Sequence, residues 1–154
     1  MDIEALIDKL YDKDTSKAFE DLKELELLSD NSNILYPYLG KFVEMVNSEK
    51  YVIRVRGFRL FCKQAKWDTE NIINKCIDSV LVLLDDEKPT AIRQAIQYLE
   101  YIVPHKKELN GKIEASVLSI DCLKFKDTMR PLIEKDIQRL LRLININEDR
   151  IKQV

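Results

Sequence analysis

A motif that recurs every 37 residues constrains the fold of this chain more than any other feature. An apolar residue followed by Arg opens a helical pattern at Val55-Arg56, and the same pair recurs at Ile92-Arg93 and Met129-Arg130, 37 residues apart each time. Two helical patterns, joined by a short polar turn, fit within each period. Repeats of this length and content are typical of α-solenoids, in which every helix pair buries its apolar face against its neighbours.

Apolar residues at helical spacing predict four such units in a single domain. We place the units at about residues 2–29, 34–66, 71–103 and 107–146, which gives eight helices in four antiparallel pairs. The chain has only three Gly and four Pro among its 154 residues, a composition that also favours an all-α fold. The last predicted helix covers about residues 128–146, and we expect the mostly polar tail, 147–154, to fray.

The repeat also predicts which positions are equivalent in the core. Ala18, Val55, Ile92 and Met129 follow one another at the period of 37 residues, so we expect all four to be buried.

The turn inside the third unit resembles the HEAT repeat motif. Residues 83–95 run from a helix ending in Leu-Leu, through an acidic turn and a Pro, to an apolar-Arg pair. The equivalent segment 48–57 lacks the Pro, and the segment 12–18 lacks the Arg. The whole chain is similar to a group of short bacterial HEAT-like proteins, some of which carry labels that point to iron-sulfur cluster assembly. This resemblance implies an α-solenoid whose second helices line a concave binding side.

Residues that could form a metal or redox site are few and far apart. Cys62, Cys76 and Cys122 show no CxxC spacing and no His pair, so we expect no iron-sulfur cluster, metal or other cofactor. Cys62 and Cys76 stand where other units carry Leu or Ile, which predicts that both are small core residues.

Residues suited to catalysis are equally sparse. The single His, His105, lies beside two Lys in a predicted loop, and no motif places a Ser or Cys next to it. The acidic pairs Asp85-Asp86 and Glu148-Asp149 fall at helix ends, where carboxylates usually cap or solvate. Three Gly are too few for a phosphate-binding loop. We therefore expect a protein without enzymatic activity.

The N-terminal residues are acidic where a signal peptide needs basic ones, and no apolar run approaches the roughly 18 residues of a membrane helix. A cytoplasmic protein with no membrane contact is the expectation that follows.

Charge is distributed unevenly along the chain. Residues 1–50 contain 6 Lys or Arg against 12 Asp or Glu, whereas residues 51–154 contain 19 against 15. Several cations of the second, third and fourth units share helical stripes, and they are our candidate partner-binding residues: Arg56, Arg59, Lys63, Lys66, Arg93, Lys135, Arg139 and Arg142.

These stripes allow two interpretations. They could be solvated faces in which Arg56, Arg93 and Arg130 bridge neighbouring turns. Alternatively, they could line a groove for an acidic partner. Aromatic contacts to that partner could come from Trp67, Tyr98 and Tyr101, although such rings more often pack in the core or between units.

The function we predict is a non-catalytic protein-interaction module or scaffold that presents its second-helix surface to an acidic protein segment. We expect a monomer, because the acidic first unit suits a solubilising cap. The alternative is a nucleic-acid-binding protein, for which HEAT-like solenoids resembling alkylpurine DNA glycosylases are the precedent. A net charge of −2 counts against it, since nucleic-acid-binding domains usually carry a strongly basic surface.

Overall fold

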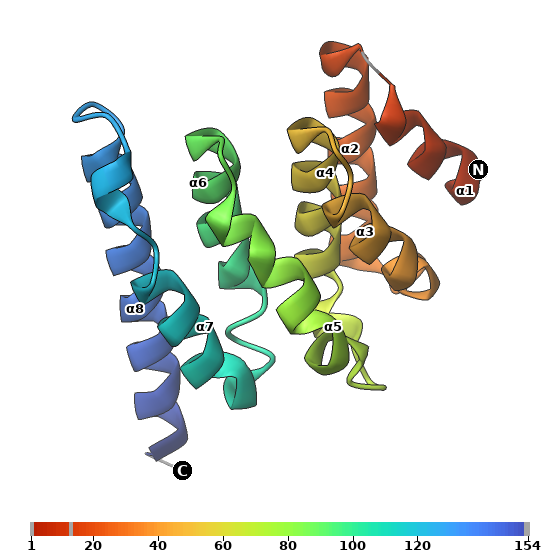
Figure 1. Ribbon diagram of the computed structural model, residues 1–154. Coiled ribbons are helices and arrows are strands. Elements are labelled where there is room, and N and C mark those ends of the chain that lie inside the picture. The colour runs from red at the N-terminus through yellow and green to blue at the C-terminus, as the bar shows by residue number, and fades with distance from the viewer. Residues whose placement is uncertain (1, 13, 153–154) are drawn as a thin grey trace.

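The computed structural model describes residues 2–12 and 14–152, with side chains up to residue 148. Within these ranges the chain forms eight α-helices and no strand, which confirms the all-α prediction (Figure 1). The helices are α1 (Ile3–Asp8), α2 (Thr15–Asn31), α3 (Leu39–Val46), α4 (Tyr51–Lys63), α5 (Ile72–Leu81), α6 (Pro89–Tyr98), α7 (Asn110–Leu118) and α8 (Arg130–Lys152). Short 3-10 turns extend several of them: η1 (Lys9–Tyr11), η2 (Tyr36–Tyr38), η3 (Ala65–Trp67), η4 (Val82–Asp85), η5 (Leu99–Tyr101), η6 (Lys107–Leu109) and η7 (Cys122–Lys124).

The helices lie in two layers. In one layer α2, α4, α6 and α8 pack in succession, each against the next. In the other, α3 packs against α4 and α5, and α7 packs against α8, so that α3, α5 and α7 lie in front of the first layer in Figure 1. None of the described helices combines the length and apolar character needed to cross a membrane.

One continuous apolar core fills the space between the layers. Ala18, Val55 and Ile92 are all buried, as the repeat predicts, and Val55 and Ile92 belong to this core. Met129 is only half-buried, because it precedes α8 in a turn that borders a hollow beside Pro89.

Local signals explain where several helices begin. The Asp14 carboxylate accepts hydrogen bonds from the amides of Ser16 and Lys17 at the start of α2. Pro89 occupies the first turn of α6, where its missing N–H leaves no bond unmade.

Two predictions need correction. The last helix begins at Arg130 and continues to Lys152, so residues 147–152 are helical where we expected a frayed tail, and 153–154 lie outside the described residues. Cys62 is buried as predicted, but Cys76 is half-buried, since it lies at the edge of the apolar face of α5. Burial raises the pKa of the Cys62 thiol well above its usual value, so this thiol stays protonated.

Candidate functional site

The basic stripe predicted on α4 is largely used inside the protein. Arg56 is buried, and its Nη1 donates to the carbonyl oxygen of Leu10 at 2.6 Å and to that of Asp12 at 3.3 Å. Burial lowers the pKa of the Arg56 guanidinium, while the charge of Asp12 opposes this shift. Arg56 therefore anchors α4 to the first unit and is buried, whereas our prediction needs an exposed cation at this position.

Its neighbours on α4 pair with acids of α2. Arg59 Nε lies 2.8 Å from Glu26 Oε1, and Lys63 Nζ lies 2.9 Å from Asp30 Oδ1. Burial alone would lower the pKa of Lys63, but the interactions with Asp30 and Tyr101 outweigh it and raise the pKa. Of the four predicted cations on this stretch, only Lys66 is exposed.

A similar bond joins the third and fourth units. Arg93 Nε donates to Asp136 Oδ2 at 2.7 Å, which links α6 to α8 and raises the pKa of Arg93. Arg130 differs, because it donates to the carbonyl oxygens of Cys122 and Phe125 within its own unit.

A polar and aromatic cluster spans three helices of one layer. Tyr98 on α6 reaches across α4, and its hydroxyl donates to Glu26 Oε2 on α2 at 2.6 Å. The guanidinium carbon of Arg59 lies 4.6 Å from the centroid of the Tyr98 ring, and Arg59 Nη1 donates to Gln94 at 3.1 Å. Burial and the bond to Glu26 both raise the pKa of Tyr98, so its hydroxyl remains a donor.

The second tyrosine of this region, Tyr101, is exposed beside the cluster. Its ring centroid lies 5.2 Å from that of Tyr98 and 4.0 Å from Lys63 Nζ. Trp67, in contrast, is half-buried, and its indole nitrogen donates to the carbonyl oxygen of Ser29 at 2.6 Å. Tyr101 is thus available to a partner, whereas Trp67 serves packing between units.

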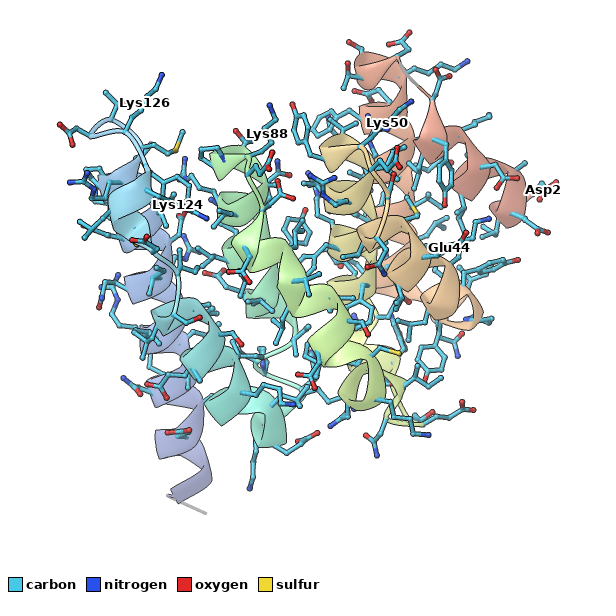
Figure 2. The ribbon with its side chains drawn as sticks, viewed as in Figure 1. Asp2, Glu44, Lys50, Lys88, Lys124 and Lys126 are labelled. Atoms are coloured by element: carbon cyan, nitrogen blue, oxygen red, sulfur yellow. The ribbon has the colours of Figure 1, made fainter. Side chains whose placement is uncertain are left out.

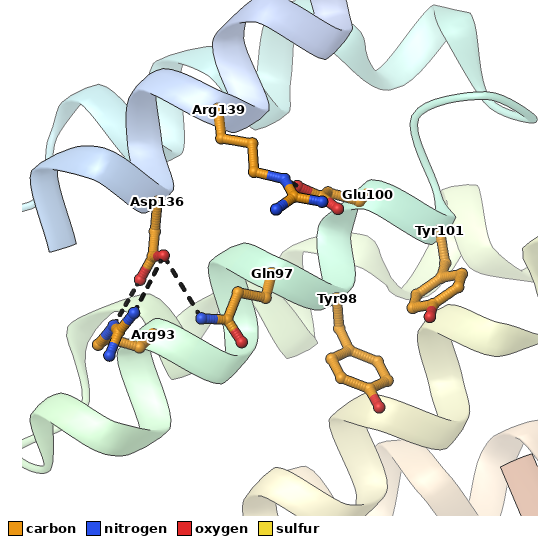
Figure 3. A pocket seen from close by; sticks show the side chains of 7 residues that line it. All are labelled: Arg93, Gln97, Tyr98, Glu100, Tyr101, Asp136 and Arg139. Carbon is orange, nitrogen blue, oxygen red and sulfur yellow. Dashed lines mark hydrogen bonds and ion pairs between the residues drawn. The ribbon is translucent and has the colours of Figure 1, made fainter. Parts of the chain in front are cut away.

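An open groove runs between α6–η5 and α8, and we call it the α6–α8 groove. Its first hollow, of about 390 Å³, is lined by Tyr98, Tyr101, Asp136 and their neighbours (Figure 3). Its second hollow, of about 350 Å³, is lined by Glu100, Arg139, Arg142, Leu143 and Ile146. The two hollows meet at the ion pair between Arg139 Nε and Glu100 Oε1, which are 2.8 Å apart.

The structure thus separates the predicted site residues into two groups. Arg56, Arg59, Lys63 and Arg93 serve contacts between units, while Lys66 of η3 and Lys135, Arg139 and Arg142 of α8 are exposed. Sequence reasoning missed the apolar part of the groove, Leu143 and Ile146. The signal was present, since both are apolar residues that flank the buried stripe of α8.

The residues that we considered for metal binding and catalysis form no cluster in the described part of the chain. Among the described residues, no three His, Cys, Asp or Glu side chains lie close enough together to hold a metal ion. His105 is exposed, as expected, and partial burial together with Lys66 and Lys106 lowers the pKa of its imidazole.

Comparison with protein-family models, with curated proteins and with solved structures finds no match to this chain. The resemblance to HEAT repeats therefore stays a prediction from the sequence.

Proposed function

We propose that this protein is a HEAT-like α-solenoid that acts as a non-catalytic protein-interaction module. The succession of α2, α4, α6 and α8 in one layer, with odd-numbered helices in the other, supports this architecture (Figure 1). The bond from Tyr98 to Glu26 supports it as well: side chains two helices apart meet over α4, as they would on the inner face of a curved row.

The observation that carries the proposal is the composition of the α6–α8 groove. It combines an exposed tyrosine, exposed arginines and partly exposed aliphatic side chains in one solvent-open depression. Tyr and Arg are the residue types enriched at protein interfaces, and they often dominate the binding energy there.

A nucleic-acid-binding function is the second candidate, and one observation favours it. Lys50, Lys88, Lys124 and Lys126 are exposed along a single edge of the molecule, at the turns that precede α4, α6 and α8 (Figure 2). Acidic residues share these turns, however, among them Glu49, Glu87 and Asp127. Because those carboxylates would repel phosphates, we rank this function second.

Capture from native cytosol, with and without nuclease treatment, separates the two functions. We expect the tagged chain to retain a protein partner after nuclease treatment, and the purified partner to bind the purified chain directly. Light scattering should show a monomer at low and high salt.

The opposite outcome is equally clear. If nuclease removes every captured protein, and the chain shifts an oligonucleotide with an affinity that falls steeply as salt rises, the nucleic-acid function replaces the protein-interaction function.

A further inference from the structure

One side of α8 carries a stripe of exposed residues that is apolar at both ends and basic in the middle. Positions 132, 135, 139, 142 and 146 recur at helical spacing, and all five side chains are exposed. Leu132 and Ile146 supply the apolar ends, with Ile146 50% exposed, while the middle positions are basic. The buried side chains of α8 point the other way, and the ion pair between Arg139 and Glu100 is the described bond that this stripe makes to another element.

The stripe has an excess of positive charge. Four cations, Arg93, Lys135, Arg139 and Arg142, lie on or beside it, against the two carboxylates Glu100 and Asp136. Both carboxylates are already paired, with Arg139 and Arg93 respectively.

The remaining cations are free to meet a partner. Lys135 and Arg142 have no ion-pair partner among the described residues, and Arg139 keeps 72% of its side chain exposed despite its pair. A partner must therefore bring carboxylates to the middle of the stripe and aliphatic groups to its ends.

We propose that the α6–α8 groove, together with the adjoining exposed stripe of α8, binds an amphipathic helix of another protein that carries acidic and aliphatic side chains on one face. This inference rests on the proposed protein-interaction function and assigns its site and ligand chemistry. From position 132 to position 146 α8 rises about 21 Å, which corresponds to a partner helix of about four turns. Helices α6 and α8 form the walls, so a third helix can settle between them with anchors at i, i+3 or i+4, and i+7.

The groove suits such a helix better than a nucleic acid. Leu143 and Ile146 would gain from burial under aliphatic side chains, which a phosphate backbone does not offer. Glu100 and Asp136 would in addition face the phosphates directly.

The test is a selection of displayed random 16-residue peptides on the immobilised full chain. The affinities of the enriched peptides are then measured by fluorescence anisotropy on purified variants. The main variant is K135E/R142E, which breaks no described ion pair. The matched control is K75E/K107E, which makes the same charge change at exposed positions on α5 and η6 that also lack a described partner. I146S probes the apolar end, and circular dichroism confirms that all variants are folded.

We expect the enriched peptides to carry Asp or Glu together with Leu, Ile or Phe at helical spacing. K135E/R142E should weaken their binding about 10-fold or more at low salt, and less at high salt, because charge pairs at a solvent-exposed surface are screened. I146S should weaken binding several-fold at every salt concentration, whereas K75E/K107E should leave it unchanged.

Other results overturn the inference in distinguishable ways. Enriched peptides that bind K135E/R142E as tightly as the natural chain would refute the α6–α8 groove as the site, yet leave a protein-interaction function standing. Failure to enrich any peptide would refute both. An oligonucleotide that binds the natural chain and loses affinity in K135E/R142E would assign this surface to nucleic acid.

Discussion

At the scale of single residues, Asp68 is the most heavily bonded carboxylate of the described chain. It is completely buried, and it receives hydrogen bonds from the Tyr36 hydroxyl at 2.6 Å and from the amides of Ile72 and Ile73. Lys106 Nζ lies 2.9 Å from its Oδ2. Burial alone would raise the pKa of Asp68, but the bonds from Tyr36, Lys106, Ile73 and Ile72 outweigh it and hold the pKa below its usual range. The same burial and the bond to Asp68 raise the pKa of Tyr36 to about 12.

This arrangement predicts a pH-dependent contribution to stability. Because the pKa of Asp68 is depressed in the folded state, its contribution is present above its unfolded pKa of about 3.9 and is lost as the pH falls through the folded value. Asp68→Asn leaves Lys106 buried without a carboxylate and should lower the free energy of unfolding by about 3 kcal/mol at pH 7. Urea unfolding should show this difference narrowing below about pH 4.

The matched control is Asp78→Asn, which removes the carboxylate of a Lys–Asp pair on the surface, with Lys112. It should change stability by less than about 1 kcal/mol. If Asp68→Asn lowered the free energy of unfolding by the same amount at every pH from 7 to 3, the ionised carboxylate of Asp68 would not be the stabilising group.

At the scale of helices, Gly57 determines how closely α4 approaches α3. A Cβ at this position would lie 2.5 Å from Met45 Cβ and 2.7 Å from the carbonyl oxygen of Phe42. Gly57→Ala should gain about 1 kcal/mol of helix propensity but lose roughly 1–3 kcal/mol through overpacking, so we expect net destabilisation. Gly40→Ala in α3 meets nothing within 4 Å and should be neutral or stabilising. Thermal unfolding measures the stability of both variants. If Gly57→Ala raised the melting temperature as much as Gly40→Ala, the close contact of α4 with α3 at Gly57 would be refuted.

The helices show what a periodic pattern can and cannot predict. Apolar spacing located all eight helices, because buried faces must repeat every 3.6 residues. It could not predict that α8 continues to Lys152, since the polar residues of that last stretch carry little apolar signal.

The spacing of cations along α4 predicted a free basic stripe and could not reveal that these cations are paired. Their partners lie one unit earlier in the sequence, and the i, i+4 spacing of Glu26 and Asp30 matches that of Arg59 and Lys63. A comparison of charge spacing between units could have found these pairs. Analysis of one helix alone could not, because a solvated face and a paired face have the same composition.

At the scale of the whole molecule, charge neutralisation is asymmetric. The acids of α2 neutralise the cations of α4, whereas Lys135 and Arg142 of α8 meet no acid among the described residues. The uneven distribution of charge along the sequence thus leaves an exposed basic stripe on α8, where α4 has mostly paired cations. This asymmetry explains why the predicted stripe on α4 gives way to the α6–α8 groove as the candidate site.

The bond from Tyr98 to Glu26 is the contact that ties the first unit directly to the third, over α4. Tyr98→Phe keeps the ring on Arg59 but removes the hydroxyl donor, and it should lower the free energy of unfolding by about 1 kcal/mol. In the proposed solenoid each unit contacts mainly its neighbours, so the loss of stability should be local, and native-state hydrogen exchange should accelerate in α2 more than in α8.

Tyr38→Phe serves as the control for this last variant, because no hydrogen bond of the Tyr38 hydroxyl occurs among the described residues. It should leave exchange in both helices unchanged. If Tyr98→Phe accelerated exchange equally in α2 and α8, the chain would open as one cooperative body, and the tie between the first and third units would have no local role. Faster exchange confined to α2 would instead mean that the Tyr98–Glu26 bond stabilises the first unit locally, without a contribution to the stability of α8.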